Sequence, residues 1–242
     1  MDKIMLVTGA SSDMGMELMS QVCHEYRRIW AHYRTSTKRF EKLAAEHEDV
    51  ITPISCDFSS VDDIGKMMAT IDKSGLMPNQ IVHFAAPRTN NNQFHKRSWE
   101  EYQNGIDISL RSITILLQRY IKHMRKEKYG RIVFLLTSYI IGVPPKFQSP
   151  YITVKYAIYG LMRNLASEYA DKGITVNGVS PDLVETKFLD DVDSLIVKQN
   201  AEKSPIKRNL NPRDVVPAIR YLLSDESEAV TGLNMGITGG VR

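Results

Sequence analysis

The sequence predicts a doubly wound α/β domain with a mostly parallel sheet of seven strands and helices on both faces. Short apolar runs alternate with longer segments of helical period along the 242 residues, which is the pattern of successive βαβ units. The run Ile132 to Leu136 is apolar at every position, as expected for a central strand covered on both faces. No repeat or low-complexity linker interrupts the series, so we expect residues 1–242 to form a single domain.

The order of the elements follows from these runs. Helices fill most of the intervals, because right-handed crossovers between parallel strands place helices on both faces of a sheet. The first helix is expected to begin near Met16, after a turn at Gly9. The expected strands are, in chain order, Ile4–Val7, Ile29–Tyr33, Val50–Cys56, Gln80–Phe84, Gly130–Leu136, Ile174–Val179 and Leu233–Ile237.

Two expected helices are apolar on more than one stripe. One runs from about Glu100 to Met124, and the other follows Thr153. A single sheet covers only one face of a helix. We therefore expect a homo-oligomer, a tetramer or a dimer, with neighbouring elements of the same chain as the alternative cover.

Composition excludes several classes of protein. With 43% hydrophobic and 24% charged residues the chain is an ordinary globular protein, and a net charge of +3 does not imply nucleic acid. Cys23 and Cys56 form no CxxC and have no histidine at metal-ligand spacing, so we expect free thiols and no metal. The apolar N-terminal run is too short for a signal peptide, and no run approaches the roughly 18 apolar residues of a membrane span. We predict a cytoplasmic protein with no membrane or nucleic-acid partner.

One cationic run stands out from this mixed surface. It precedes an expected strand, where basic side chains complement the free carbonyls of a helix end, and a docking patch for an acidic carrier protein is the alternative. The run consists of Lys122, Arg125, Lys126, Lys128 and Arg131.

A glycine-containing turn joins the first strand to the first helix. Such a turn lets backbone amides approach a pyrophosphate, and the helix N-terminus adds partial positive charge. The residues expected to contact a dinucleotide there are Gly9, Ser11, Ser12, Asp13, Met14 and Gly15.

The strongest signal for chemistry is Ser138, followed by Tyr151 and Lys155. Tyr151 and Lys155 lie four positions apart and share one face of a helix, while Ser138 follows the carboxyl end of an apolar strand. A phenol with an ordinary pKa near 10 is reluctant to exchange protons at neutral pH, and a neighbouring ammonium favours its ionised form. The three residues therefore predict proton transfer to or from a substrate oxygen.

The turn and this Ser…Tyr-x-x-x-Lys pattern resemble the short-chain dehydrogenase/reductase family, and in particular its 3-oxoacyl-(acyl-carrier-protein) reductase-like members. The resemblance covers essentially the whole chain. It implies a Rossmann fold and an NAD(P)-dependent enzyme that moves a hydride between nicotinamide and a carbonyl or alcohol carbon. In this family the serine binds the substrate oxygen, and the lysine also binds the nicotinamide ribose.

Further matches predict the rest of the cofactor site. Arg34, Thr35 and Ser36 end the second strand with no acid before Glu41, which predicts NADP(H) in preference to NAD(H). Asp57, followed by Phe58, matches the family position beside adenine, and the same residue can also cap the helix that follows. The resemblance assigns the nicotinamide and phosphate side to Ala85, Ala86, Pro181, Val184 and Thr186.

Four positions depart from the family pattern. Asp13 and Asp182 stand where glycines are usual, and we expect Asp13 to point away from the phosphates or to cap the helix, with weaker cofactor binding as the alternative. Ser109 aligns with a fourth catalytic residue, an asparagine, and is expected to bind relay water less effectively. We expect His83 to be a hydrogen-bonded residue at a strand end rather than a general base.

The segment around 187–207 lies where the family places a substrate lid. Its apolar residues Phe188, Leu189, Leu195 and Ile196 are expected to face a hydrophobic substrate, with Asp190, Asp191 and Asp193 on a solvated rim. The first substrate hypothesis is a 3-oxoacyl thioester, free or bound to a carrier protein. The alternative function is a dinucleotide-binding regulatory or scaffold protein with little or no turnover.

Overall fold

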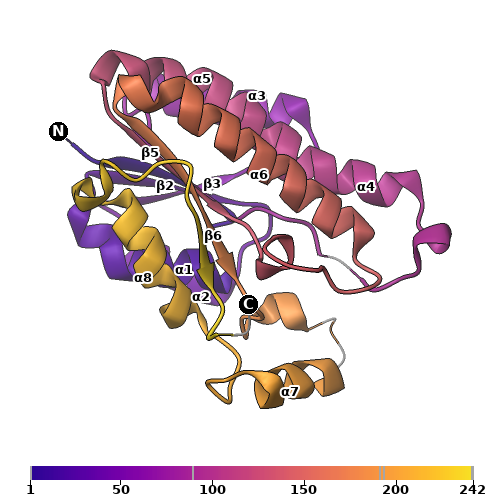
Figure 1. Ribbon diagram of the computed structural model, residues 1–242. Helices are drawn as coiled ribbons and strands as arrows, with labels where there is room; N and C mark the ends of the chain where they lie inside the picture. The colour runs from indigo at the N-terminus through magenta and orange to yellow at the C-terminus, as the bar shows by residue number, and fades with distance from the viewer. Residues whose placement is uncertain (1, 89, 191, 193, 241–242) are drawn as a thin grey trace.

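The computed structural model describes residues 2–88, 90–190, 192 and 194–240, and its strands form one parallel sheet (Figure 1). The strand order is β3-β2-β1-β4-β5-β6-β7, so the direction of winding reverses between β1 and β4. This confirms the doubly wound fold predicted from the apolar runs. The strands are β1 Ile4–Thr8, β2 Arg28–Tyr33, β3 Ile51–Ser55, β4 Gln80–His83, β5 Gly130–Leu135, β6 Ile174–Pro181 and β7 Asn234–Ile237.

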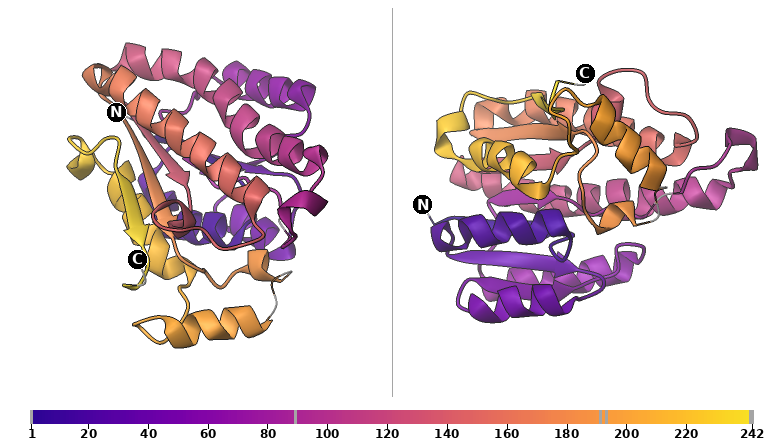
Figure 2. Two further views of the ribbon diagram at one scale, coloured as in Figure 1. Left: turned by 45° about the vertical axis from the view of Figure 1, so that its right-hand side comes forward. Right: turned by 90° about the horizontal axis from the view of Figure 1, so that it is seen from below.

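Helices cover both faces of the sheet, as Figure 2 shows from two further sides. One apolar core joins the sheet to α3, α5 and α6, and a second core joins the other face to α1, α2 and α8. The helices are α1 Asp13–Val22, α2 Lys38–Glu46, α3 Val61–Ser74, α4 Trp99–Gly105, α5 Ser112–Glu127, α6 Ser149–Tyr169, α7 Ser194–Lys203 and α8 Pro212–Leu223.

Helix α1 begins three residues earlier than the sequence predicts. The hydroxyl of Ser12 accepts a hydrogen bond from Gly15 N at 3.1 Å and so caps the helix at its first turn. The expected start near Met16 was wrong because the apolar period begins inside the helix, whereas the cap is a polar contact.

The long helix expected up to Met124 is interrupted. A π-helical segment, Ile106–Arg111, separates α4 from α5 and includes Ser109. Single π-helical turns inside α-helices are frequent at functional sites. Apolar periodicity does not distinguish the two helix types over so few residues, so the sequence carries no signal of this change.

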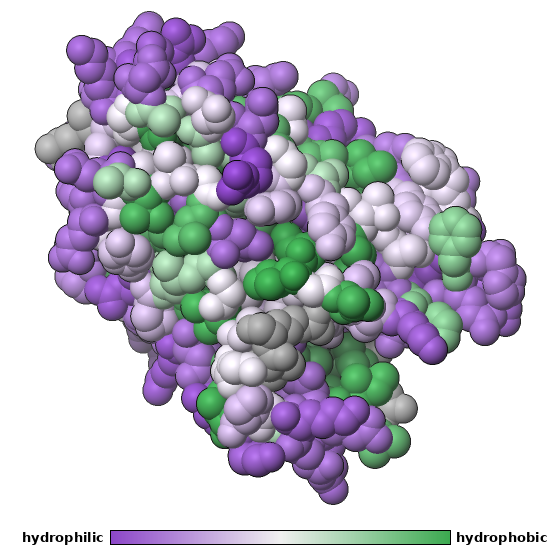
Figure 3. All heavy atoms as spheres, in the orientation of Figure 1, coloured by the Kyte–Doolittle hydropathy of each residue, from purple (hydrophilic) through white to green (hydrophobic). Residues whose placement is uncertain are grey.

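The apolar stripes that suggested an oligomer are largely covered within the chain. The inward residues of α5 and α6 belong to one buried core, and α4 contacts α6 directly. Tyr156 of α6 is 44% exposed. Apolar residues also gather near the middle of the surface in Figure 3, with hydrophilic residues around them. Neighbouring elements of the same chain therefore cover most of the apolar surface of both helices. The tetramer or dimer stays a prediction.

The cationic run divides into two parts. Lys122, Arg125, Lys126 and Lys128 are exposed at the end of α5, as the helix-end interpretation predicts. Arg131 is only 4% exposed; its guanidinium lies 4.5 Å from the centroid of the Tyr129 ring and 3.7 Å from the carboxylate of Asp225. Arg131 therefore cannot belong to a docking surface.

Two further findings concern the described residues alone. None of their helices has both the length and the apolar character needed to cross a membrane. Cys23 and Cys56 are buried free thiols.

Candidate active site

Tyr151 and Lys155 come together in the first turns of α6. Pro150 lies in the first turn of this helix, where its lack of an N–H costs no hydrogen bond. Lys155 Nζ lies 5.5 Å from the centroid of the Tyr151 ring and donates to the carbonyl oxygen of Leu135, at the end of β5, at 2.6 Å. The side chain predicted to assist the phenol is thus held between α6 and the sheet.

Burial dominates the acid–base properties of this pair. It raises the pKa of Tyr151 to about 12, against a lowering by a hydrogen bond with Thr137, and it lowers the pKa of Lys155 to about 8. Tyr151 is therefore neutral at pH 7 and able to give a proton. The lowering of the Tyr151 pKa that the sequence predicts is not produced by the protein alone. Thr137, next to Ser138, is a site residue that the sequence analysis missed.

Ser138 lies just past β5 in a short 3-10 turn. It is fully buried, and its hydroxyl donates to Asp182 Oδ1 at 3.0 Å. Asp182, one of the acids in a glycine position, follows β6 and is 8% exposed. The sequence placed both residues at strand ends but gave no signal that they meet.

His83 and Ser109 also meet beneath the site. The Nδ1 of His83 lies 2.7 Å from the Thr8 hydroxyl, and its Nε2 lies 2.9 Å from the carbonyl oxygen of Ser109. Burial lowers the pKa of His83 to about 3. Since both ring nitrogens are engaged and the ring is 2% exposed, His83 is a hydrogen-bonded strand-end residue as predicted.

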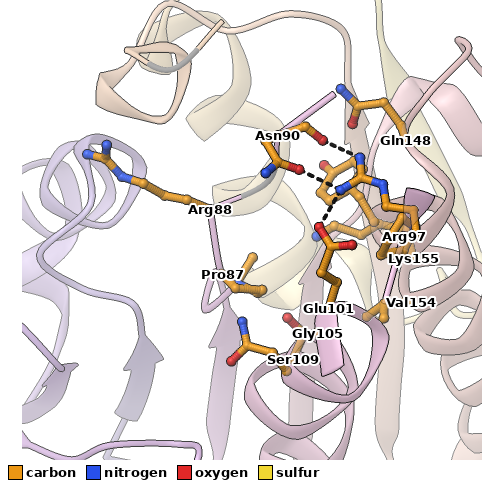
Figure 4. Close-up of a pocket in the computed structure, with 14 residues that line it drawn as sticks. Pro87, Arg88, Asn90, Arg97, Glu101, Gly105, Ser109, Gln148, Val154 and Lys155 are labelled. Atoms are coloured by element: carbon orange, nitrogen blue, oxygen red, sulfur yellow. Dashed lines mark hydrogen bonds and ion pairs between the residues drawn. The ribbon is translucent and has the colours of Figure 1, made fainter. Parts of the chain in front are cut away.

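A cavity of about 450 Å³ opens beside Tyr151 and Lys155 (Figure 4). Tyr151, Lys155 and Ser109 form one part of its wall, and the loop after β4, α4 and the start of α6 form the remainder. The rest of the lining mixes polar and apolar residues and consists of Ala86, Pro87, Arg88, Asn90, Arg97, Glu101, Asn104, Gly105, Gln148, Pro150 and Val154.

Arg97 organises this wall and was missed by the sequence analysis. Its side chain is 3% exposed and donates to Glu101 at 2.6 Å and to the carbonyl of Phe147 at 2.8 Å. It also donates to Asn90, and Figure 4 shows its guanidinium between Asn90 and Glu101, whereas Arg88 points away from this cluster. These bonds fix the loop after β4 against the segment before α6. An arginine in a polar stretch of sequence gives no sign of such burial.

The predicted phosphate turn, Gly9 to Gly15, has the close backbone approaches that glycine permits. Gly9 has φ +70°, and a Cβ there would lie 3.0 Å from Ala85 N; a Cβ on Gly15 would lie 2.7 Å from Ala10 Cα. Met14 is buried, and Ser11 donates to the carbonyl of Thr35 at 3.0 Å. The turn thus combines a tight backbone path with a helix N-terminus, which fits the pyrophosphate of a dinucleotide.

His32 supports this turn from β2 and was not singled out in the sequence. Its Nδ1 accepts from Gly9 N at 3.1 Å, and its Nε2 lies 3.1 Å from the carbonyl oxygen of Cys56. The ring stacks on Phe58 with 3.8 Å between centroids. A histidine inside an otherwise apolar strand was the only available signal.

Asp13 does not cap α1, so the capping part of the expectation was wrong. Ser12 caps the helix instead, and the Asp13 carboxylate accepts from Lys187 N at 2.9 Å and pairs with Arg39 at 3.2 Å. The acid in the turn therefore holds the start of the predicted lid.

Some of the side chains predicted to bind the adenosine part of the cofactor are exposed, and others already have hydrogen-bond partners. Arg34 and Thr35 are exposed, while the Ser36 hydroxyl donates to Glu41 at 2.8 Å. Asp57 accepts from the backbone N and the hydroxyl of Ser59, and these bonds lower its pKa. Asp57 thus forms a turn, and the expected helix-cap role was wrong because Ser60 caps α3.

The residues predicted to lie beside the nicotinamide begin at the end of β6. Pro181 is the last residue of that strand, Val184 pairs with Leu210, and the Thr186 hydroxyl accepts from Phe188 N at 3.4 Å. Ala85 is buried after β4, and its N donates to the Thr8 hydroxyl at 3.4 Å.

The predicted lid comprises a 3-10 turn, Lys187–Leu189, and α7. The Phe188 ring lies 6.3 Å from that of Tyr151, and Asp190 pairs with Arg88 of the cavity wall at 3.9 Å. Leu195 and Ile196 are exposed, so these two apolar residues do not face the cavity. Asp191 and Asp193 lie outside the described residues.

This fold and site define a class of protein. A phenol and an ammonium lie beside a cavity at the carboxyl ends of the strands, next to a dinucleotide turn at the point where the winding reverses. That arrangement is typical of an oxidoreductase acting on a CH–OH or C=O group. Within the part of the chain that the structure describes, no group of His, Cys, Asp and Glu is arranged to hold a metal.

Comparisons with known proteins identify the family. Residues 9–242 match the family model described as enoyl-(acyl carrier protein) reductase, and the chain belongs to the short-chain dehydrogenase/reductase family. The 3-oxoacyl-(acyl-carrier-protein) reductase FabG of Rickettsia bellii is 28% identical over 240 residues, covering 98% of this chain and 95% of the relative. The acetoacetyl-CoA reductase of Allochromatium vinosum is 28% identical over 250 residues, covering 100% and 99%.

Solved structures agree in fold. Levodione reductase superposes with a TM-score of 0.89 at 22% identity, covering 99% of this chain and 97% of the other. ElxO with NADP bound has a TM-score of 0.88 at 22% identity, covering 99% and 98%. At these identities the likeness shows the fold alone.

Proposed function

We propose that the protein is an NADPH-dependent reductase of a 3-oxoacyl thioester carried by coenzyme A or by a carrier protein. The observation that carries this proposal is the buried pair of Tyr151 and Lys155 beside a cavity open to substrate. The FabG and acetoacetyl-CoA reductase relatives, whose names state such substrates, support the choice of substrate class. We also propose, from the sequence, that the protein is cytoplasmic and forms a homo-oligomer.

The residues of the chain divide the proton chemistry among them. When bound, the reduced nicotinamide supplies the hydride that the carbonyl carbon receives. Tyr151 gives its proton to the carbonyl oxygen as negative charge develops there, and Lys155 stabilises the phenolate that results. Since the pKa of Lys155 is lowered to about 8, this lysine can itself exchange a proton near neutral pH. Ser109, on the same cavity wall, is the position from which relay water would reach Lys155.

The cofactor site favours a phosphorylated ribose. Arg34 is an exposed cation at the end of β2, and charge-assisted hydrogen bonds from arginine suit a dianionic phosphate. Ser36 contributes less than the sequence predicts, because its hydroxyl donates to Glu41. ElxO has been solved with NADP bound, which agrees with this choice.

The experiment is NADPH oxidation over a panel of 3-oxoacyl thioesters and other carbonyl compounds, with the variant Tyr151→Phe as control. We expect turnover of a thioester by the natural chain and a loss of several orders of magnitude in the variant, with NADPH binding nearly unchanged. An active Tyr151→Phe variant would remove Tyr151 from the mechanism, and tighter binding of NADH than of NADPH would overturn the cofactor preference.

A second candidate is a dinucleotide-binding regulatory or scaffold protein. The hydrogen bond from Ser138 to Asp182 favours this second candidate. It engages the serine proton that would otherwise be donated to a substrate carbonyl. Tight NADPH binding without turnover of any compound in the panel would support this candidate.

A further inference from the structure

A carboxylate of the predicted phosphate turn holds the backbone of the predicted lid. Asp13 Oδ2 accepts from Lys187 N at 2.9 Å, and Asp13 Oδ1 pairs with Arg39 at 3.2 Å. The Asp13 side chain is only 14% exposed, so little water competes for its oxygens. A hydrogen bond to an ionised acceptor is roughly twice as strong as one between neutral groups. The lid backbone is therefore fastened to the residue at which α1 begins.

The position of Lys187 determines that of the residues after it. Lys187 begins a 3-10 turn, Lys187–Leu189, and its carbonyl oxygen accepts from Asp190 N at 3.3 Å. The turn carries Phe188, whose ring lies 6.3 Å from the ring of Tyr151. Tyr151 lines the cavity. The contact at Asp13 therefore reaches the cavity wall through one short turn of backbone.

We propose that Asp13 is a positioning residue that keeps the segment 187–190 closed beside Tyr151 before a substrate binds. The proposal rests on the proposed function. A segment that becomes ordered only when the ligand binds lowers the affinity for that ligand, whereas a segment already held in place does not. Loss of the hydrogen bond should therefore raise KM for the thioester. It should leave kcat nearly unchanged, because the closed complex is the same once it has formed.

The variant Lys187→Pro removes this hydrogen bond without changing Asp13. Proline has no N–H, and its fixed φ suits the first position of a helical turn. Thr186 has φ −146° and ψ 167°, which is the extended backbone favoured before a proline. Lys187→Ala is the matched control, because it loses the same positive charge and keeps the N–H.

The first measurement is steady-state reduction of acetoacetyl-CoA at saturating NADPH. We expect KM to be about three- to tenfold higher in Lys187→Pro than in Lys187→Ala, which corresponds to the net contribution of one hydrogen bond. Asp13→Ala should also raise KM, and adding Lys187→Pro to it should raise KM no further, because both changes remove the same contact. A lower kcat with the same KM in Lys187→Pro would indicate a distorted site and overturn the inference.

The second measurement, hydrogen exchange followed by mass spectrometry, needs no catalysis. The segment 187–190 should exchange at least about threefold faster in Asp13→Ala than in the natural chain. If exchange is the same in both and the two Lys187 variants have the same KM, the inference is wrong and the proposed function stands. If the natural chain reduces no thioester, the proposed function fails, and the inference fails with it whatever the exchange rates are.

Discussion

Two buried histidines should make the protein less stable as the pH falls below neutral. Burial lowers the pKa of His32 to about 4 and that of His83 to about 3, from an ordinary value of 6.5. His32 accepts from Gly9 N through Nδ1, so a proton added there would bring two donors together. The folded protein therefore resists protonation of both rings.

The direction and size of this loss of stability follow from the difference in histidine pKa between the folded and the unfolded chain. Below pH 6.5 the unfolded chain takes up a proton on each histidine, while the folded chain takes up none until the pH approaches 4 for His32 and 3 for His83. The stabilisation is complete above pH 6.5 and is lost as the pH falls from there toward these values. At pH 5 the free energy of unfolding should be lower than at pH 7 by about 2 kcal/mol for each histidine, or by about 4 kcal/mol for the two together.

Urea unfolding at pH 7, 6 and 5, at constant ionic strength, measures this loss. The variant His32→Gln has no titrating group at this position, so its stability should change by about 2 kcal/mol less than the natural chain between pH 7 and pH 5. His24→Gln is the matched control, because the side chain of His24 is 71% exposed. An unchanged pH dependence in His32→Gln would refute the argument from His32.

Three further predictions concern the predicted cofactor site. Arg34→Ser should weaken NADPH binding about tenfold or more in a fluorescence titration and leave NADH binding nearly unchanged. Gly15→Ala should destabilise the protein by about 1–3 kcal/mol in urea unfolding, because its Cβ would meet the backbone of Ala10, whereas Gly65→Ala, with open space in α3, should stabilise it by up to about 1 kcal/mol. Asp13→Asn should tighten NADPH binding a few-fold by removing a negative charge beside the turn; weaker binding would contradict this.

The parts of the structure that the sequence predicted depend on local patterns. Strands such as β5 are visible because a strand covered on both faces must be apolar at every position. Tyr151 and Lys155 were predictable because one helix brings them together, whatever else the chain does. The geometry of the phosphate turn followed in the same way from glycines at a strand–helix junction.

The remaining contacts of the site join residues far apart in the chain. His32 meets Gly9, and Asp13 meets Lys187, only after the sheet has formed and the crossovers have returned. No spacing rule connects such pairs, and a polar residue in an apolar strand gives only a general sign of a buried partner. The partners of His32 and Asp13 therefore became known from the structure alone.

The two acids that the family resemblance assigns to glycine positions both have hydrogen-bond partners in this structure. The Asp13 carboxylate accepts from the backbone N of Lys187 and pairs with Arg39. The Asp182 carboxylate accepts from the Ser138 hydroxyl. Asp13 thereby joins the turn to the predicted lid, and Asp182 binds the serine that is predicted to be catalytic. Because a hydroxyl has one proton to donate, the Ser138 proton is directed at Asp182 in this structure. Binding and turnover measurements on variants of Asp13 and Asp182 should therefore show whether these two acids alter the predicted cofactor and catalytic sites.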